Sequence, residues 1–307
     1  MKYNTKERVL VLLASFNGAL WLEEQLRSLT EQLNVDIDVL ISDDGSSDKT
    51  IDIIRNYEFY GTNVHLLENV VPSGSAGQNF INLIKRADSS GYGYVALADQ
   101  DDVWLNDKIA SAISILGSEG AAAYSSSVTA FWSDGRKKKL IQSKNIREFD
   151  FLFEGAGQGC TFIIREQHFR RIAEFFRGNS DLVRSFHYHD WLIYLLLRVW
   201  GEKWVFDLNS HIMYRQHSSN EIGARKGLSA VKSRLSRIRS GWYSKQVFVA
   251  YQIAVKASLD QISGRPKKVL FGASTLRMRK AIFVLKCGRR RFSDRIILFF
   301  SAWMGWL

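Results

Sequence analysis

The stretch RVLVLLASF, residues 8–16, decides the fold because six successive apolar residues follow Arg8. A continuous apolar run of this length indicates a strand that is buried on both faces of a sheet. Residues 19–33, ALWLEEQLRSLTEQL, come next with apolar residues at helical spacing, and residues 37–44, IDVLISDD, form a second apolar run. A strand, a helix and a second strand in this order are typical of a parallel sheet covered by helices.

The same alternation continues toward the middle of the chain. Further strands are predicted in NVHLLE (63–68), YGYVALADQDD (92–102), AAAYSSSVTAFW (121–132), CTFIIRE (160–166), KWVFDL (203–208) and HIMYRQH (211–217). Further helices are predicted in KTIDIIRNY (49–57), SAGQNFINLIKRAD (75–88), VWLNDKIASAISIL (103–116) and HDWLIYLLLRVWG (189–201). We therefore predict an α/β fold with a doubly wound, mostly parallel sheet, in which ligands bind beyond the carboxyl ends of the strands.

Charge divides the chain into two parts. Residues 223–307 hold 19 Lys and Arg against 2 Asp and Glu, whereas residues 1–222 hold 23 against 29. We predict an α/β domain over 1–222 and a helical, basic region over 223–307, whose charge suits a polyanionic partner. Two distant cysteines fit a reducing cytosol, and the N-terminal apolar run is too short for a signal peptide.

The last residues favour a membrane surface over nucleic acid as that partner. The segment RIILFFSAWMGWL (295–307) is apolar but shorter than the ~20 residues of a spanning helix. Trp303, Trp306 and the preceding KCGRRRFSDR (286–295) are typical of an interfacial anchor, although residues 296–307 can instead form a helix packed in the core. A tail that binds nucleic acid would have aromatic residues spaced among basic ones, whereas this chain ends in contiguous apolar residues. We therefore expect no nucleic-acid partner.

Acidic side chains stand where predicted strands end. Asp43 and Asp44 end the second strand, and Asp99, Asp101 and Asp102 end the fourth. The carboxyl ends of parallel strands share one rim, so these carboxylates should converge and repel one another unless a cation lies between them. Mg²⁺ and Mn²⁺ prefer oxygen ligands, and the sequence does not choose between them. For Asp102, capping of the following helix remains an alternative.

Several segments, in this order and spacing, resemble the family 2 glycosyltransferases, which have a GT-A fold. They are VLLASFNGALWLEEQLRSL (11–29), ISDDGSSDKT (41–50) and LADQDDVW (97–104). The later segments GQGCTFIIR (157–165), HDWL (189–192) and YRQHSSNEIGA (214–224) are similar to a bacterial rhamnosyltransferase branch that acts in O-antigen assembly. The resemblance covers residues 8 to about 223. Many family members carry a basic residue where this chain has Gln78 before Asn79.

The resemblance implies a donor site built from the first four strands. Ser15, Phe16 and Asn17 match the loop that lines the nucleotide pocket. Asp43 matches the acid that accepts from N3–H of a uracil or thymine ring, with Asp44 beside it. Asp99 matches the acid near the ribose, and Asp101 matches the ligand of the metal that holds the diphosphate.

The later motifs match the acceptor side and a loop that closes over the donor. Asp190 matches the catalytic base, with an ordinary helix N-cap as the alternative. The other matches are Gly159 and Cys160, which border the sugar pocket together with Trp191, and Arg215 and His217, which close over the diphosphate, His217 as a further metal ligand. The run HYHD at 187–190 has too few ligands for a zinc site.

We therefore predict an inverting, metal-dependent glycosyltransferase that uses a uridine- or thymidine-diphosphate sugar, with dTDP-L-rhamnose preferred. The expected acceptor is a lipid-linked oligosaccharide at the inner face of the cytoplasmic membrane. Inversion needs a base for the acceptor hydroxyl and charge stabilisation on the diphosphate. Two alternatives stay open. A nucleotidyltransferase would need a Gly-rich loop with Lys or Arg where this chain has ASFNGALW, and a non-catalytic sugar-nucleotide-binding module would not need Asp190.

Overall fold

The sheet is built around strand β1 (Glu7–Ser15), which pairs in parallel with β2 (Val35–Asp43) and β4 (Tyr94–Asp99). Its side chains alternate between two buried clusters, so the strand is covered on both faces, as its apolar run predicts. The computed structural model describes residues 6–60, 63–67, 71–141, 145–217, 236, 238–258, 266–272 and 276–307.

The described strands form one nine-stranded sheet in the order β3-β2-β1-β4-β8-β6-β9-β5, with β7 paired to β6. The other strands are β3 (Val64–Leu67), β5 (Val103–Trp104), β6 (Ala123–Trp132), β7 (Lys137–Leu140), β8 (Ile163–Arg165) and β9 (Trp204–Gln216). Strands β1 to β4 are mutually parallel, and β8 runs antiparallel between β4 and β6. The predicted α/β fold with a mostly parallel sheet is confirmed.

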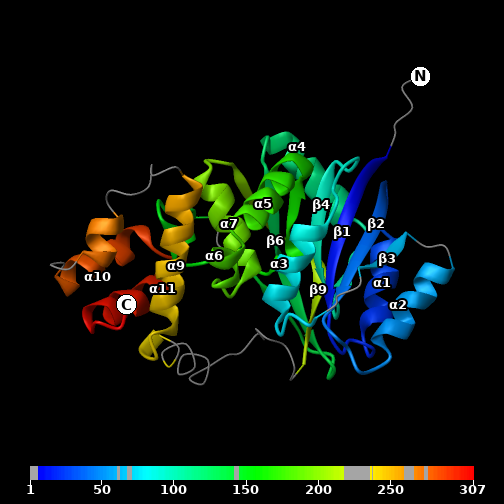
Figure 1. The fold of residues 1–307 in the computed structure, drawn as a ribbon, viewed down its shortest axis with the longest axis horizontal. Helices are drawn as coiled ribbons and strands as arrows, with labels where there is room; N and C mark the ends of the chain where they lie inside the picture. Colours follow the sequence, from blue (N-terminus) through cyan, green and yellow to red (C-terminus); the bar gives the residue numbers. More distant parts are fainter. Residues whose placement is uncertain are drawn as a thin grey trace.

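Helices cover both faces of this sheet, and the last ones extend the molecule at one end (Figure 1). The helices are α1 (Leu22–Thr30), α2 (Thr50–Phe59), α3 (Ala76–Arg86), α4 (Lys108–Glu119), α5 (Glu166–Gly178), α6 (Ser180–Arg184), α7 (His189–Val199), α9 (Trp242–Ala257), α10 (Arg277–Cys287) and α11 (Phe292–Trp303). Short helical turns lie at Asp150–Leu152, Gly159–Thr161 and Lys267–Phe271. The first helices, α1, α2 and α4, share one buried cluster, and α3, α5 and α7 share the other.

Three predicted elements differ from the structure. The strand predicted at 160–166 is reduced to β8, because Gly159–Thr161 form a helical turn. The helix predicted over 103–116 begins only at Lys108, because Val103 and Trp104 pair with β9 as strand β5. The two strands predicted at 203–208 and 211–217 are one strand, β9. Its polar middle is accommodated by an irregularity in the pairing with β6, where the Asn209 backbone N–H donates to Asp207 Oδ1 at 2.8 Å.

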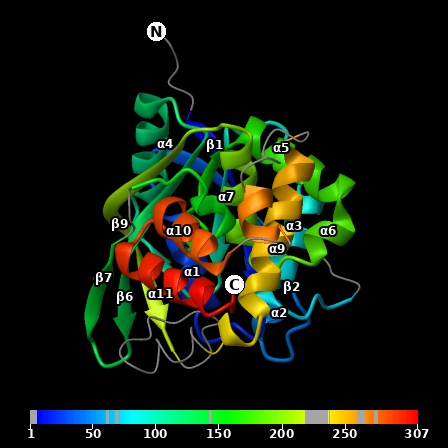
Figure 2. The ribbon, with the colours of Figure 1, turned by 90° about the vertical axis from the view of Figure 1, so that its left-hand side faces the viewer.

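The helices α9 to α11 pack on the sheet domain rather than standing apart from it. They lie side by side at one end of the molecule (Figure 2). Val247 of α9 and Leu298 of α11 belong to the same buried cluster as Phe162 and Leu192. The predicted boundary between residues 222 and 223 lies outside the described residues, as does the start of the basic helical region.

Residues 296–307 have a buried side and an exposed side. Leu298 and Ala302 are buried, whereas Phe300 and Trp303 are about half exposed. In the described part of the chain, every helix is too short or too polar to cross a membrane. The core alternative therefore holds for one face of α11, and the other face is open to a partner.

Candidate active site

A cleft of about 920 Å³ lies where strands β1, β2 and β4 end. It brings together residues that are far apart in the sequence. Among the predicted site residues, those that line it are Ser15, Asn17, Asp44, Asp99, Asp101, Gly159, Asp190 and His217. Phe16 lines the cleft as well, whereas Asp43 and Asp102 do not, so Asp44, Asp99 and Asp101 are the strand-end acids that share the cleft with Asp190.

The two acids that follow β2 have different surroundings. Asp43 is buried and accepts hydrogen bonds from the Ser15 hydroxyl (2.8 Å), from the Ser46 hydroxyl (2.6 Å) and from two backbone N–H groups of its own turn. Asp44 lines the cleft, and its Oδ2 accepts from the Gly74 N–H at 2.9 Å. Asp43 thus shapes the turn, while Asp44 borders the space where a ligand can bind. The contact predicted for Asp43 with a pyrimidine ring stays a prediction.

The loop after β1 is held in place by side chains from both neighbouring strands. Asn17 has a φ of 48°, a conformation that Asn adopts more easily than most residues, and its Oδ1 accepts from the Ser47 N–H at 2.9 Å. Gln100 accepts from the Phe16 N–H (2.8 Å) and donates to the Phe16 carbonyl (2.9 Å). Gln100 was missed by sequence reasoning, although it stands between Asp99 and Asp101.

Asp101 and His217 form the candidate metal site. His217 Nε2 lies 2.6 Å from Asp101 Oδ2, and the imidazole stacks on Trp21 with the ring centroids 4.0 Å apart. Asp99 lines the same cleft. Carboxylate oxygen and imidazole nitrogen are donors that suit Mn²⁺, and carboxylates suit Mg²⁺, so the residues present fit a divalent cation.

A buried polar layer adjoins this site. One ligand-type atom each from Asp99, Asp102 and Cys160 lies within 4.8 Å of the others. Burial, with the Asp99 and Asp101 charges, raises the pKa of the Asp102 carboxyl, and burial beside these carboxylates raises the pKa of the Cys160 thiol. Both shifts favour protonated groups, which are poor ligands for Mg²⁺ or Mn²⁺. The metal contacts expected for Asp101 and His217 stay a prediction.

Asp102 and Arg215 both connect strand β9 to the acidic loop after β4. Asp102 is fully buried and accepts the Arg215 backbone N–H at 3.1 Å, so it ties β9 to the acidic loop and is not the cap of α4, whose N-cap is Asp107. The Arg215 side chain donates to the Asp101 carbonyl at 2.8 Å and pairs with Glu24. Arg215 therefore holds the backbone of a candidate metal ligand, and its contact with a diphosphate stays a prediction.

Asp190 lies in the first turn of α7 and lines the cleft. The N-cap position of α7 belongs to Tyr188, but Asp190 Oδ1 accepts the Trp191 N–H of the first turn at 2.7 Å, which is a contact of the capping type. The role of Asp190 as catalytic base stays a prediction. Gln78 replaces a basic residue of the family pattern. Its side-chain amide donates to the carbonyls of Arg184 (3.1 Å) and Phe186 (3.2 Å), which fixes the segment that leads into α7.

Glycines allow the start of α7 to be packed tightly from two sides. A Cβ on Gly77 would lie 2.2 Å from the His187 carbonyl oxygen. A Cβ on Gly159 would lie 2.8 Å from His189 Nε2 and 3.3 Å from Asp190 Cβ. Helix α3 therefore packs against the backbone that leads to Asp190, and the segment before β8 packs against the side chains of His189 and Asp190.

The remaining residues predicted to border the sugar pocket lie at different depths. Gly159 lines the cleft, and Cys160 is fully buried. Trp191 is buried with its indole N–H donating to the Phe151 carbonyl at 2.7 Å, and it lines a second cavity of about 300 Å³. Asp190 lines both cavities, so it stands where they meet.

Comparisons with known proteins agree with this geometry. Residues 10–187 match the family model described as Glycosyl transferase family 2. The dTDP-rhamnosyl transferase RfbG of Shigella flexneri is 38% identical over 236 residues, which cover 76% of this chain and 82% of that protein.

Two further comparisons concern a more distant relative and the fold. An Escherichia coli enzyme, UDP-Glc:alpha-D-GlcNAc-diphosphoundecaprenol beta-1,3-glucosyltransferase WfgD, is 23% identical over 159 residues, which cover 52% of this chain and 60% of that protein. A mannosyltransferase of Pyrobaculum calidifontis in complex with GDP-Man and Mn²⁺ superposes with a TM-score of 0.53 at 14% identity, covering 97% of this chain and 86% of that one. The chain with this cleft is thus a glycosyltransferase, and it belongs to glycosyltransferase family 2.

Proposed function

We propose that the enzyme transfers L-rhamnose from dTDP-L-rhamnose, with inversion, to a lipid-linked oligosaccharide during the assembly of a surface polysaccharide of the O-antigen type. The observation that carries the proposal is the single cleft that is lined by Asp99, Asp101 and His217 and also by Asp190. The relative named a dTDP-rhamnosyl transferase supports the donor. The relative whose name contains a diphosphoundecaprenol acceptor supports a lipid-linked acceptor.

The side chains around the cleft have different roles in this reaction. Asp190 takes the proton of the acceptor hydroxyl as that oxygen attacks, a contribution of typically ~10²–10⁴ in rate. Asp101 and His217 would hold Mg²⁺ or Mn²⁺, which, when bound, offsets negative charge on the departing diphosphate. Trp21 fixes the orientation of His217 by stacking, and Arg215 fixes the backbone of Asp101.

Attachment to the inner face of the cytoplasmic membrane is part of the proposal. Phe292, Ile296, Phe300 and Trp303 are exposed on α11, and their spacing places them on one stripe of the helix. The same two helices and their connection also carry cationic side chains: Arg277, Arg279, Lys286, Arg291 and Arg295. Each Lys or Arg near an anionic bilayer adds ~1 kcal/mol to binding.

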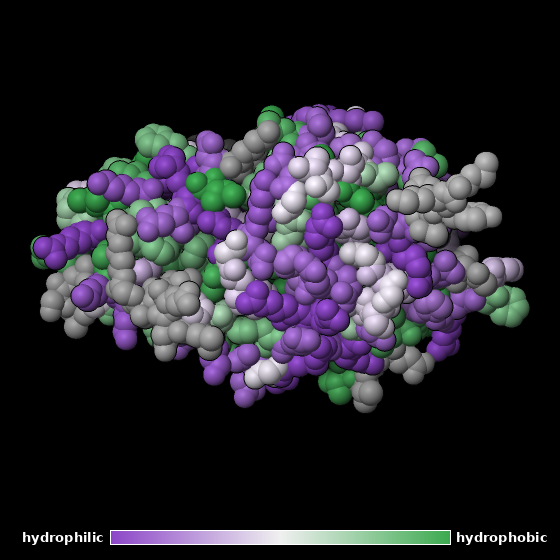
Figure 3. Space-filling view, turned by 90° about the horizontal axis from the view of Figure 1, so that it is seen from above, coloured by the Kyte–Doolittle hydropathy of each residue, from purple (hydrophilic) through white to green (hydrophobic). Residues whose placement is uncertain are grey.

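The outer surface at this end of the molecule fits such a contact. Hydrophobic and hydrophilic residues lie next to one another at the left-hand end in Figure 3, the end that carries α9 to α11. An interfacial segment combines apolar side chains that enter the lipid with cations that remain at the headgroups. The exposed apolar residues of α11, together with the cationic residues of α10 and α11, therefore suit a helix pair that lies on a membrane.

Thermal unfolding in the presence of nucleotides tests the donor assignment. With Mn²⁺ or Mg²⁺ present, dTDP-L-rhamnose at 100 times its dissociation constant should stabilise the protein by ~2.7 kcal/mol. GDP-mannose is the matched control and should give a smaller shift. A larger shift with GDP-mannose, or a shift with dTDP-L-rhamnose that is unaffected by a metal chelator, would contradict the donor or the metal assignment respectively.

A further inference from the structure

We infer that the second cavity, of about 300 Å³, binds an uncharged monosaccharide unit of the acceptor, and that the C-terminal helices supply its specificity. The inference rests on the proposed function and concerns the acceptor side of the same site. The cavity is lined by residues before and at the start of α7 and by residues that follow position 236, among them Trp242, Arg289 and Asp294. Its volume is at the lower end for ligand pockets, which fits a small ring rather than a longer oligosaccharide.

The position of Asp190 connects this cavity to the reaction. Asp190 lines both the large cleft and the second cavity, and Tyr188 and Gly157 do so as well. A sugar in the second cavity therefore has a hydroxyl within reach of the residue that we assign as the base, while the donor occupies the cleft on the other side. Such an arrangement allows donor and acceptor to be bound at the same time.

Aromatic rings and carboxylates make up the chemically distinctive part of the lining. Tyr188 and Trp242 pack edge to face with their centroids 5.8 Å apart, and Trp191 and Tyr243 stack at 6.2 Å. Aromatic faces suit the C–H face of a pyranose ring. Carboxylates accept hydrogen bonds from hydroxyl groups. Together they fit a polyhydroxylated ring.

Two other occupants fit the lining less well. A phosphate would meet the carboxylates of Glu154, Asp190 and Asp294, and the guanidinium groups beside them are already paired, Arg289 with Asp294 at 3.5 Å and Arg290 with Glu154 at 3.5 Å. An aliphatic lipid chain would take these carboxylates out of water without offering them hydrogen bonds, which is costly. The charge of the lining therefore favours a neutral sugar.

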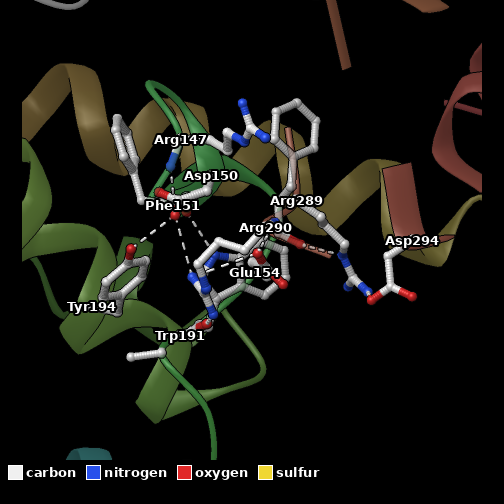
Figure 4. A network of polar contacts seen from close by, with 12 residues as sticks. Arg147, Asp150, Phe151, Glu154, Trp191, Tyr194, Arg289, Arg290 and Asp294 are labelled. Atoms are coloured by element: carbon white, nitrogen blue, oxygen red, sulfur yellow. Dashed lines mark hydrogen bonds and ion pairs between the residues drawn. The ribbon is translucent and has the colours of Figure 1, made fainter. Parts of the chain in front are cut away.

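A buried ion network fixes the C-terminal wall of the cavity relative to Asp190 (Figure 4). Arg290 is buried and bonds Asp150 at 3.3 Å and the Gly155 carbonyl at 2.5 Å. Asp150 also accepts from the Tyr194 hydroxyl (3.0 Å) and from Arg198 (2.8 Å), both on α7. The segment after α10 is thus joined through Asp150 to the helix whose first turn carries Asp190.

Helix α11 relates this cavity to the proposed membrane face. Ile297 and Leu298 of α11 line the cavity, whereas Phe300 and Trp303 on the same helix are exposed. The same helix therefore contributes both to the cavity and to the proposed membrane face.

Saturation-transfer NMR with methyl glycosides tests the inference. The probes are methyl glycosides of glucose, galactose, rhamnose and N-acetylglucosamine, with methyl glucuronide as the charged comparison, each at up to ~20 mM so that millimolar dissociation constants are detected. We expect at least one neutral glycoside to bind in the presence of saturating dTDP and Mn²⁺. Trp242→Ala should weaken that binding at least ~10-fold. Phe248→Ala, which truncates an exposed ring on the same helix outside the cavity lining, should leave it unchanged.

Other outcomes would overturn the inference. The inference fails if no neutral glycoside binds, or if dTDP displaces a glycoside that does bind. It also fails if the glucuronide binds more tightly than every neutral glycoside, or if Trp242→Ala leaves glycoside binding unchanged. If Trp242→Ala does not fold, Ile297→Trp, which fills the cavity from α11, provides the second variant and should abolish glycoside binding. Stabilisation of each variant by dTDP is measured in parallel. If dTDP does not stabilise the wild-type protein, the result counts against the proposed function. If dTDP stabilises the wild type but no neutral glycoside binds, the result counts against the second cavity alone.

Discussion

Gly77 offers a sharp test of how the protein positions Asp190. It is the second residue of α3, and a Cβ at this position would lie 2.2 Å from the His187 carbonyl oxygen, closer than the 3.0 Å that real Cβ contacts respect. The contact is with backbone rather than with a flexible side-chain end. In Gly77→Ala, either α3 or the segment that leads to Asp190 must therefore shift by about 1 Å to relieve the overlap.

The size of the effect follows from this displacement. A misplacement of ~1 Å can lower a catalytic rate by ~10²-fold, and overpacking costs ~1–3 kcal/mol of folding stability. We expect kcat for transfer to fall about 100-fold and Tm to fall by ~2–4 °C for each kcal/mol lost. Binding of dTDP should persist, because Asn17 and Asp44 line the cleft from other segments.

Gly117→Ala is the matched control. Gly117 also lies in a helix, α4, but a Cβ there meets nothing within 4 Å, so the substitution should stabilise the protein by ~0.5–1 kcal/mol and leave kcat unchanged. The assay is the initial rate of sugar transfer at saturating donor, with thermal unfolding and dTDP calorimetry on each variant. A wild-type transfer rate in Gly77→Ala would refute the reasoning, because the close packing would then not determine where Asp190 lies.

Three further perturbations test other parts of the site and surface. Asp101→Asn should weaken Mn²⁺ binding at least ~10-fold, because the substitution removes a carboxylate ligand that also orients His217. The affinity is measured by paramagnetic resonance titration in the presence of dTDP, and an unchanged affinity would exclude Asp101 from the metal site. Burial lowers the pKa of Lys108 from its usual 10.5 to about 7. Between these two pH values the unfolded chain binds more protons than the folded one, so the free energy of unfolding should rise by up to ~1.4 kcal/mol per pH unit. Lys108→Met should reduce that slope in urea unfolding measured from pH 7 to 10, and an equal slope in both proteins would disprove the shift. Replacing Phe300 and Trp303 together by Ser should lower cosedimentation with anionic vesicles at least ~10-fold. Because each ring is about half exposed, the lost packing should lower Tm modestly. Undiminished cosedimentation would mean that α11 does not contact the bilayer.

Much of the fold was predictable because β1 has an unambiguous pattern. Its apolar run must be covered on both faces, which requires a sheet with helices on either side. The strand-end acids were predictable for a related reason, since the carboxyl ends of parallel strands meet at one rim. The cleft lined by Asp44, Asp99 and Asp101 follows from those two facts.

Features that depend on tertiary contacts were not predictable in the same way. Val103 and Trp104 are apolar in a helical pattern, yet pairing with β9 makes them a strand. Gln100 has no periodic signal and acts through hydrogen bonds to a loop 84 residues away. The second cavity forms only when α9 and α11 pack beside α7, so Trp242 could be recognised in sequence as a helix residue but not as a wall of a site.

The rate of sugar transfer by Asp190→Asn, measured beside its affinity for dTDP, tests the central claim most directly. An amide cannot accept the acceptor proton but keeps the size of the carboxylate. The account predicts a loss of ~10²–10⁴ in transfer rate with nearly unchanged dTDP binding. Transfer at the wild-type rate would show that the residue between the two cavities is not the base, and the assignment of the active site would be contradicted.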